Sequence, residues 1–365
     1  MLIVAKVGTS SVTDEDGALD VSAVERICDE VAAVRSLGHD VVLVTSGAIA
    51  AGLPMMGLTS KQRPKDARTL QAIASVGQVN LMATYAEALR ARHSIICGQV
   101  LLVPHDFFER DQYLHARATL ERLLELGVLP IVNENDTVAD HEIRFGDNDR
   151  IAALLAQAIQ ADMLVLLTDT AGLLTADPRL DSSASLIEEI VEFDRDLEAL
   201  AQGSSSNRGS GGMASKVAAA KMASWAGVRT VIAAANRPSV LADAAAKVPG
   251  VGTVVLPKPL GLSARKVWIA FAVGSAGLIT VDDGAKRALT NGGGSLLAAG
   301  VRDIEGEFGV DDAVELCGPD GEVFAKGLTL MDSVTANARK GQRSEGENDT
   351  RSSLVIHRDD LVILA

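Results

Sequence analysis

The chain has 365 residues, with 34 basic and 48 acidic side chains, so its formal net charge at pH 7 is -14. This length predicts two domains or three. Apolar residues make up 47% and aromatic ones only 3%, which favours helix-on-sheet cores of small aliphatic side chains over an aromatic-rich β-sandwich. The acidic excess argues against a protein whose main task is binding nucleic acid, because neutralising phosphates takes clustered lysine and arginine.

The cysteines and the longest uncharged stretch exclude two further classes. Cys28, Cys97 and Cys317 lie far apart and match neither a disulfide framework nor a metal-ligand spacing, so we expect small core residues in a reducing cytoplasm. The start of the chain lacks the basic leader of a secretory signal. Residues 41–60 are uncharged, but their glycines and Pro54 predict strand, turn and loop rather than a membrane span.

The first 260 residues alternate short apolar runs with helical patterns, which indicates βαβ units and a largely parallel sheet. Strands are expected at 2–5, 41–44, 95–102, 129–132, 163–167 and 229–234. Helices are expected at 21–37, 67–92, 114–126, 151–159 and 214–226. The strand at 229–234 should be the last of this domain. Gly38, Gly127 and Gly227 follow three of the helices, as left-handed C-terminal caps do.

The composition changes after Val254. We predict a first domain over 1–258, a linker over 259–274 and a second domain over 275–355. The second domain contains short β-like runs at close intervals, separated by turn signals such as Gly-Pro-Asp-Gly at 318–321. These runs predict a small β-barrel.

Four turns of the first domain combine small residues with polar or cationic side chains, and ligands of open parallel sheets bind at the carboxyl ends of strands. The turn Lys6–Ser10 places a cation beside a glycine whose neighbouring N–H groups can surround a phosphate. The alternative is a surface lysine at a tight turn. In Thr45–Gly52, small residues admit a ligand close to the backbone, and the hydroxyls of Thr45 and Ser46 can donate to oxyanions. The alternative is a plain strand-to-helix junction.

The third turn is unusually rich in carboxylates and amides. It comprises Asn133-Glu134-Asn135-Asp136 and, just before a helix, Gly146-Asp147-Asn148-Asp149. Asp136 and Asn148 are candidates to hold the ammonium and carboxylate of an amino acid, and Asp149 is a candidate to orient catalytic cations. The alternative is a solvated loop that caps a helix.

The fourth turn, Gly209–Lys216, opens a helix. Glycine-rich turns at helix N-termini bind phosphate through N–H groups and the helix dipole, and Lys216 adds a charge. The turn matches neither the P-loop nor the dinucleotide motif, and a flexible linker is the alternative. Upstream, Thr168 and Asp169 end the strand at 163–167, where a nucleotide can bind. Two lysines on separate glycine-rich turns, with acidic and amide loops between them, suggest in-line phosphoryl transfer.

The segments KVGTS, TSGAIAAG, NENDTV, FGDNDR, LLTDTAGLLTADPR and GSGGMASK together closely resemble the bacterial glutamate 5-kinases of the amino acid kinase superfamily. The C-terminal β segment resembles a PUA domain. The resemblance implies an α/β fold: a three-layer αβα sandwich with a mainly parallel sheet, plus the small PUA-like β-barrel. It also implies ATP as phosphoryl donor, with Mg²⁺ carried mainly by the ATP phosphates.

The resemblance also implies roles for individual residues. Lys6 and Lys216 would stabilise the transferring phosphoryl group, and Asp149 would hold both lysines in place. Glutamate would bind to Ser46, Asp136 and Asn148. ATP would bind to Lys6, Thr168, Asp169, Ser210, Gly211, Gly212, Met213, Ala214, Ser215 and Lys216.

The implied reaction converts ATP and L-glutamate to L-glutamyl 5-phosphate, the first step of proline biosynthesis. The family further implies feedback inhibition by proline, a homo-oligomer (dimer or tetramer), and a transient complex with glutamyl phosphate reductase in the cytoplasm. RNA binding is not expected, because residues 262–365 carry more acidic than basic side chains. The alternatives are a sibling kinase acting on N-acetylglutamate, aspartate or UMP, and a PUA-bearing RNA-binding regulator.

Overall fold

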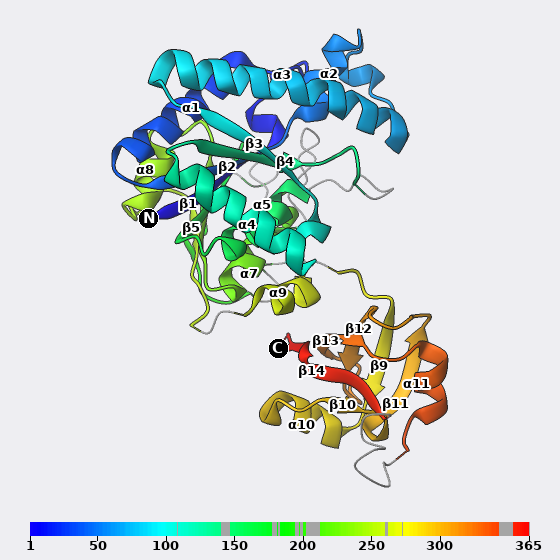
Figure 1. Cartoon of the computed structure of the whole chain (residues 1–365). Coiled ribbons are helices and arrows are strands. Elements are labelled where there is room, and N and C mark those ends of the chain that lie inside the picture. The colour runs from blue at the N-terminus through cyan, green and yellow to red at the C-terminus, as the bar shows by residue number, and fades with distance from the viewer. Residues whose placement is uncertain are drawn as a thin grey trace. The chain divides into compact units, whose positions relative to one another are not determined.

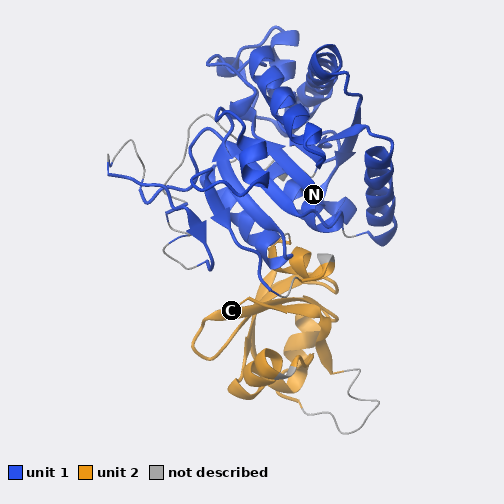
Figure 2. Ribbon diagram, turned by 90° about the vertical axis from the view of Figure 1, so that its left-hand side faces the viewer, with its two compact units in different colours: residues 1–261 blue, residues 262–365 orange. Residues whose placement is uncertain are grey.

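A computed structural model describes residues 1–107, 109–139, 147–176, 181, 183–193, 197, 200–201, 212–259, 262–271, 273–342 and 353–364. The chain divides into two compact units, residues 1–261 and 262–365, coloured separately in Figure 2. Each unit has its own sheet and its own core, so each is described by itself.

Unit 1 is built on an eight-stranded sheet with the order β3-β4-β2-β1-β5-β7-β8-β6. The strands are β1 (Leu2–Val7), β2 (Asp40–Thr45), β3 (Cys97–Leu102), β4 (Leu129–Glu134), β5 (Met163–Thr168), β6 (Glu189–Ile190), β7 (Arg229–Ala234) and β8 (Thr253–Val255). All paired neighbours run parallel except β7 and β8. Every residue of β5 is buried, as expected for a central parallel strand covered on both faces.

Helices cover both faces of this sheet (Figure 1). They are α1 (Val21–Ser36), α2 (Ala48–Met55), α3 (Ala67–His93), α4 (Arg110–Glu125), α5 (Asp147–Ala158), α7 (Met213–Trp225) and α8 (Val240–Ala245). Side chains of α1, α3 and α8 share one core with alternate residues of β1, namely Ile3, Ala5 and Val7. Helices α5 and α7 pack on the sheet and on each other. This confirms the expected αβα sandwich.

The ends of α1 show how local sequence sets the limits of an element. The Asp20 carboxylate accepts hydrogen bonds from the backbone N–H groups of Ser22 and Ala23, which starts the helix. Gly38 follows the helix with φ +82, a left-handed conformation that glycine adopts without strain. The predicted range of 21–37 therefore differs from α1 by one residue.

Helix α2 lies where the sequence predicts turn and loop, so that prediction was wrong. Its formation depends on α3, because Gly52 of α2 and Gly77 of α3 bring the two backbones into close contact. A Cβ atom on Gly77 would lie 1.8 Å from the Ala48 carbonyl oxygen, and one on Gly52 would lie 2.1 Å from that of Ile73. Pro54 lies inside this short helix, where it has no N–H to donate to the Ala50 carbonyl and where α2 ends one residue later.

The sheet also extends past the strand predicted to be its last. Strand β8 pairs antiparallel with β7, and β6 pairs parallel with β8. These strands are three and two residues long, too short to show a recognisable period of two in the sequence.

Unit 2 holds a curled six-stranded sheet with the order β10-β14-β13-β12-β9-β11 (Figure 1). Its strands are β9 (Gly277–Val281), β10 (Leu296–Leu297), β11 (Val301–Gly306), β12 (Ala313–Cys317), β13 (Val323–Thr329) and β14 (Leu354–Ile363). Its helices are α9 (Ala264–Phe271), α10 (Asp283–Gly292) and α11 (Ser333–Arg339). Helix α9 occupies part of the expected linker and packs on β13 and β14. The predicted limits of both domains stay predictions.

The structure also shows where two of the cysteines lie and whether a described helix could cross a membrane. Cys28 and Cys317 are buried free thiols, and burial raises the pKa of the Cys28 thiol to about 12. Within the described ranges, no helix combines the length and the apolar character needed to cross a bilayer.

Candidate active site

Strand alternation directs Lys6 away from the core of α1, α3 and α8. Because Ile3, Ala5 and Val7 face that core, Lys6 points to the opposite face of β1, where α5 packs. The side chain of Lys6 is 3% exposed, and its Nζ lies 2.6 Å from Oδ1 of Asp149 on α5. The first predicted lysine is therefore a buried, ion-paired residue rather than a surface side chain.

Helix α7 brings the second lysine to the same carboxylate. Lys216 Nζ lies 3.5 Å from Oδ2 of Asp149, and the Ser215 hydroxyl lies 2.7 Å from the same oxygen. The Ser215 hydroxyl is also 2.8 Å from the carbonyl oxygen of Gly212, which precedes α7. The structure thus brings Lys6, Lys216 and Asp149 together, although 210 residues separate the two lysines in the chain.

Burial and charge act against each other in this cluster. Burial lowers the pKa of the Lys6 ammonium, and the positive charge of Lys216 adds to that effect, while the Asp149 carboxylate opposes it. Burial alone would raise the pKa of the Asp149 carboxyl. The charges of Lys6 and Lys216, with hydrogen bonds from Lys6 and Ser215, outweigh burial and hold that pKa below its usual value. Asp149 is therefore an anion that balances two ammonium groups.

A second polar group, made of uncharged side chains around one backbone N–H, lies at the end of β4. Asn133 is 2% exposed, and its Oδ1 accepts a hydrogen bond of 2.9 Å from the backbone N–H of Glu134. The same N–H lies 3.1 Å from Oδ1 of Asn148, in the first turn of α5. Ser46 follows β2, the strand adjacent to β4 in the sheet, and is 8% exposed. Gly47, the next residue, has φ +108 and starts α2.

Asp136 lies partly buried in the segment that follows β4. Its charge acts on Arg63, a residue that sequence reasoning missed: burial lowers the pKa of the Arg63 guanidinium, and the Asp136 carboxylate opposes this shift. Gln78 of α3 was also missed, although Asn133 Nδ2 donates a 2.7 Å hydrogen bond to its Oε1. Gln78 lies inside a long helix and Arg63 in a charged loop without a glycine-rich turn, so nothing in the sequence relates either residue to the other site residues.

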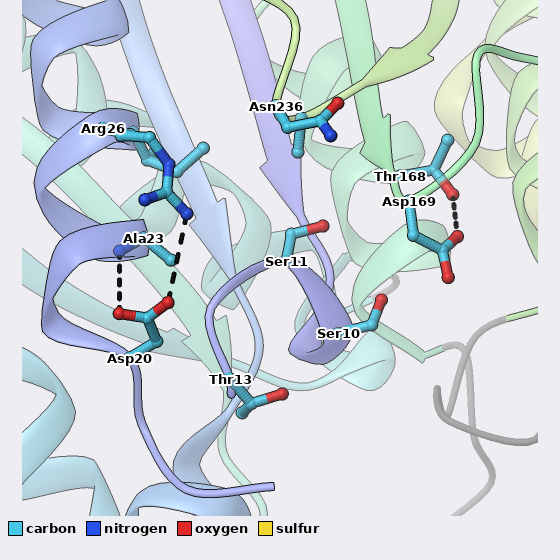
Figure 3. Close-up of a pocket in the computed structure, with 11 residues that line it drawn as sticks. Ser10, Ser11, Thr13, Asp20, Ala23, Arg26, Thr168, Asp169 and Asn236 are labelled. Carbon is cyan, nitrogen blue, oxygen red and sulfur yellow. Dashed lines mark hydrogen bonds and ion pairs between the residues drawn. The ribbon is translucent and has the colours of Figure 1, made fainter. Parts of the chain in front are cut away.

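A polar pocket of about 160 Å³ lies at the carboxyl ends of β1, β5 and β7 (Figure 3). Two of the predicted nucleotide-binding residues, Thr168 and Asp169, line it, and the Thr168 hydroxyl donates to the Asp169 carboxylate at 3.2 Å. Ser10, Ser11 and Asn236 line the same pocket. Of these three, Ser11 and Asn236 were not predicted, since their positions follow only from the folded sheet edge.

The glycine-rich turn before α7 is described in part. Gly212 is the N-cap, and Met213, Ala214, Ser215 and Lys216 form the first turn of α7. The predicted nucleotide-binding residues Ser210 and Gly211 lie outside the described residues, as does Gly146. Backbone N–H groups at a helix start suit an anion such as a phosphate.

Whether the protein's own side chains could hold Mg²⁺ depends on which carboxylates could serve as its ligands. Among the described residues, no group of three or more His, Cys, Asp or Glu side chains has the arrangement of a metal site. Asp149 already contacts both lysines. The arrangement thus fits a cation carried by nucleotide phosphates better than one held by a cage of protein ligands.

Comparisons with known proteins cover the whole chain. The sequence profile of the amino acid kinase family matches residues 1–234, and that of the PUA domain matches residues 277–346. Glutamate 5-kinases of Pelobacter propionicus and Trichlorobacter lovleyi are each 43% identical over 99% of this chain, covering 97% and 96% of the relatives. That of Nitrosospira multiformis is 44% identical over 99% of this chain and 97% of the relative. Among solved structures, Giardia lamblia carbamate kinase bound to AMP-PNP is less similar: 20% identical, TM-score 0.49, covering 70% of this chain and 98% of that one.

Proposed function

The chain belongs to the amino acid kinase family and, within it, to the glutamate 5-kinases. From this membership we propose that it transfers the γ-phosphoryl group of ATP to the side-chain carboxylate of L-glutamate. The product is L-glutamyl 5-phosphate, an acyl phosphate. The arrangement of Lys6, Asp149 and Lys216 is the observation that carries the proposal for the mechanism.

The chemistry needs positioning and charge neutralisation more than a nucleophilic side chain. A carboxylate is already ionised at neutral pH, so it attacks the phosphorus without a general base. Negative charge spreads over the equatorial oxygens of the phosphoryl group as it passes in line between the leaving oxygen and the attacking oxygen. Lys6 and Lys216 stabilise that charge from two directions, and their effect is strong because both ammonium groups are buried.

Asp149 acts as a positioning residue. Two buried ammonium groups would repel each other, and the carboxylate between them lowers that cost while fixing the direction of each side chain. The Ser215 hydroxyl, within hydrogen-bond distance of the same carboxylate, ties it to the first turn of α7. The groups that face the phosphates are thus set before ATP binds.

ATP binds along the carboxyl edge of the sheet. Thr168 and Asp169 bind one part of the nucleotide. The turn Ser210–Lys216 binds its phosphates through backbone N–H groups and the ammonium group of Lys216. Mg²⁺ bound to the ATP phosphates supplies further positive charge. The pocket beside Thr168 and Asp169 supports this placement, because its hydroxyl and carboxylate groups suit a polar nucleoside.

L-Glutamate binds at the ends of β2 and β4. Asp136 pairs with the α-ammonium group, and Ser46 and Asn148 contribute hydroxyl and amide groups. The link between Asn148 and the backbone of Glu134 supports this assignment, because it joins the start of α5 to the end of β4. The side-chain carboxylate of the substrate then faces Lys6 and Lys216.

Trapping the product tests the reaction. The purified protein is incubated with ATP, Mg²⁺, L-glutamate and hydroxylamine, which converts an acyl phosphate to a coloured hydroxamate. We expect hydroxamate with L-glutamate and much less with N-acetylglutamate or aspartate. UMP kinase activity would consume ATP with UMP and give no hydroxamate. ATP consumption with UMP, or a preference for another acid, would contradict the proposed substrate.

The family also supports proposals about partners. Proline competes with glutamate at or beside its site, the chain forms a homo-oligomer in the cytoplasm, and the labile product passes to glutamyl phosphate reductase in a transient complex. The PUA-like part acts without RNA. An unchanged product lifetime and pathway flux when the reductase is kept physically apart would contradict the transient complex.

A further inference from the structure

Helix α3 runs along the segment that follows β4. Three of its side chains contact the end of β4 and this segment. Gln78 Oε1 lies 2.7 Å from Nδ2 of Asn133 in β4, Ser75 Oγ lies 3.1 Å from Thr137 Oγ1, and Gln71 Nε2 lies 3.1 Å from the Ala139 carbonyl oxygen. Asp136 lies in the chain between the residues that contact Gln78 and Ser75. The helix therefore forms a wall beside the proposed binding residue for the α-ammonium group.

A backbone group fixes the orientation of two side-chain amides here. The N–H of Glu134 can only donate, so the Asn133 atom that it contacts at 2.9 Å is the carbonyl oxygen. The other end of that amide, Nδ2, then donates to Gln78. Gln78 must present its oxygen to Asn133, and its Nε2 group therefore points elsewhere.

Gln78 Nε2 is buried and has no hydrogen-bond partner among the residues that the structure describes. A buried donor without an acceptor destabilises a folded protein, so such groups commonly serve a ligand or an ordered water. Nε2 carries two protons and no acceptor lone pair, and its ligand must therefore be an acceptor.

The position of Gln78 points to the glutamate site. Its neighbour Gly77 contacts the first turn of α2: a Cβ atom there would lie 1.8 Å from the Ala48 carbonyl oxygen. That turn directly follows Ser46. Gln78 thus lies between the end of β2 and the end of β4, the two places that hold the proposed glutamate residues.

We propose that Gln78 Nε2 donates a hydrogen bond to the α-carboxylate of L-glutamate. The inference rests on the function proposed above and adds a specificity-determining residue to it. The α-carboxylate is the acceptor because it shares a carbon with the α-ammonium group that Asp136 binds. The side-chain carboxylate faces the two lysines instead. Asn133 is a positioning residue, since its amide holds Gln78 in the orientation that exposes the donor.

The variant Gln78→Glu tests the NH₂ group of this side chain without removing the oxygen that contacts Asn133. An oxygen still accepts from Asn133 Nδ2, while a second oxygen replaces the outward NH₂ group. We expect the KM for L-glutamate to rise about 10- to 100-fold, because a charge-assisted hydrogen bond is replaced by repulsion. The kcat and the KM for ATP should stay within about twofold to threefold of wild type.

A change of substrate sharpens the test. L-Glutamic acid α-amide keeps the side-chain carboxylate but carries an NH₂ donor in place of one α-carboxylate oxygen. The introduced carboxylate of Gln78→Glu can accept from that donor. We therefore expect the ratio of kcat/KM for glutamate over the α-amide to fall at least about 10-fold relative to wild type.

Asn80→Asp is the matched control. It introduces the same amide-to-carboxylate change on α3, two residues away, at a side chain that makes no hydrogen bond to the end of β4 among the described residues. Its KM for glutamate should match that of wild type. If circular dichroism shows that Gln78→Glu is unfolded, the uncharged variant Gln78→Met takes its place, with the same selective loss of glutamate affinity expected.

A binding measurement separates failure of this inference from failure of the proposed function. The rise in Tm with L-glutamate alone needs no turnover, and it should shrink in Gln78→Glu but persist in Asn80→Asp. Wild-type protein that gives neither hydroxamate nor a glutamate-dependent Tm would remove the function itself. An active wild type with an unchanged glutamate KM in Gln78→Glu would overturn only the role of Gln78. Parallel losses for glutamate and ATP would assign Gln78 a purely structural role and overturn the inference as well.

Discussion

The phosphoryl side of the site consists of buried charges, whereas the acceptor side is organised by neutral amides. On the first side, Asp149 contacts both lysines directly. On the second, Asn133 contacts Gln78, and Asn133 and Asn148 both accept from the backbone N–H of Glu134. The contrast matches the chemistry proposed for each side. Developing phosphoryl charge requires cations, while selecting an amino acid depends on directional donors and acceptors.

The difference also has an energetic consequence. Each buried charge depends on its partner, because removing one leaves the other uncompensated in a low-dielectric environment. Removing one member of a neutral amide pair leaves a buried donor or acceptor unsatisfied, which costs about 1 to 3 kcal/mol and so less than an uncompensated buried charge. Substitutions on the phosphoryl side should therefore reduce stability and turnover, and substitutions on the acceptor side should mainly reduce glutamate affinity.

The largest effect is expected for Asp149→Ala. It leaves two buried ammonium groups without their shared counter-ion, which should lower the free energy of unfolding by about 3 to 5 kcal/mol. Urea unfolding followed by circular dichroism measures the change. Adding Lys6→Met to Asp149→Ala should recover part of the loss, because one unpaired charge is then removed. Equal stability of Asp149→Ala and wild type would contradict the ion-pair cluster.

Lys6→Ala and Lys216→Ala test the phosphoryl side by turnover. Each should lower kcat about 10²- to 10³-fold and change the KM for glutamate far less, because the cation acts on charge that develops in the transition state. Steady-state kinetics with hydroxamate detection measures both constants. Lys221→Ala, on the same helix α7 but outside the cluster, is the matched control and should keep the wild-type kcat. A change confined to KM would remove the lysine from the catalytic role.

Asp136→Ala tests the acceptor side. We expect the KM for glutamate to rise about 10- to 100-fold, since the α-ammonium group loses a charged partner, while the KM for ATP stays close to wild type. A substrate titration at saturating ATP measures the effect. An unchanged glutamate KM would remove Asp136 from the substrate site.

The pH dependence should show the smallest effect. Lys6 acts as an ammonium group, and because burial lowers its pKa, kcat should fall with rising pH before the ordinary lysine value of 10.5 is reached. Asp149 has a pKa lowered below 3.8, so its stabilising ion pairs persist above that value and are lost as pH falls through the lowered pKa. The pH profile of kcat measures the alkaline limit set by Lys6, and an acid-unfolding curve measures the acidic limit set by Asp149. An alkaline limb at or above 10.5 would contradict the buried state of Lys6.

The sequence predicted the strands and helices of unit 1 where their patterns are long. The apolar run of β5 and the Gly38 signal after α1 are local, so they can be recognised without the fold. Helix α2 could not be predicted in this way. Its stretch of small residues, glycines and Pro54 is typical of a loop, and it becomes a helix only because Gly77 allows α3 to approach Gly52.

The residues of the candidate site also divide into those that the sequence indicates and those that only the fold relates to the site. Lys6, Lys216 and Asp149 follow from local motifs, because charges beside glycine-rich turns at strand ends are conspicuous in a sequence. Gln78 and Arg63 are inconspicuous, since one lies inside a long helix and the other in a charged loop. Only the hydrogen bond between Gln78 and Asn133, and the effect of the Asp136 charge on the pKa of Arg63, relate them to the site.

The sequence by itself therefore determined the kind of fold, the positions of the longer regular elements and the residues that carry charge to the strand ends, because each depends on neighbours within a few positions. Tertiary structure decided which of these residues meet. Pairing of Asp149 with both Lys6 and Lys216 requires a parallel crossover, the alternation of β1 and the packing of α5 against α7. The free donor of Gln78 is also decided there, since one backbone N–H of β4 orients two amides in succession.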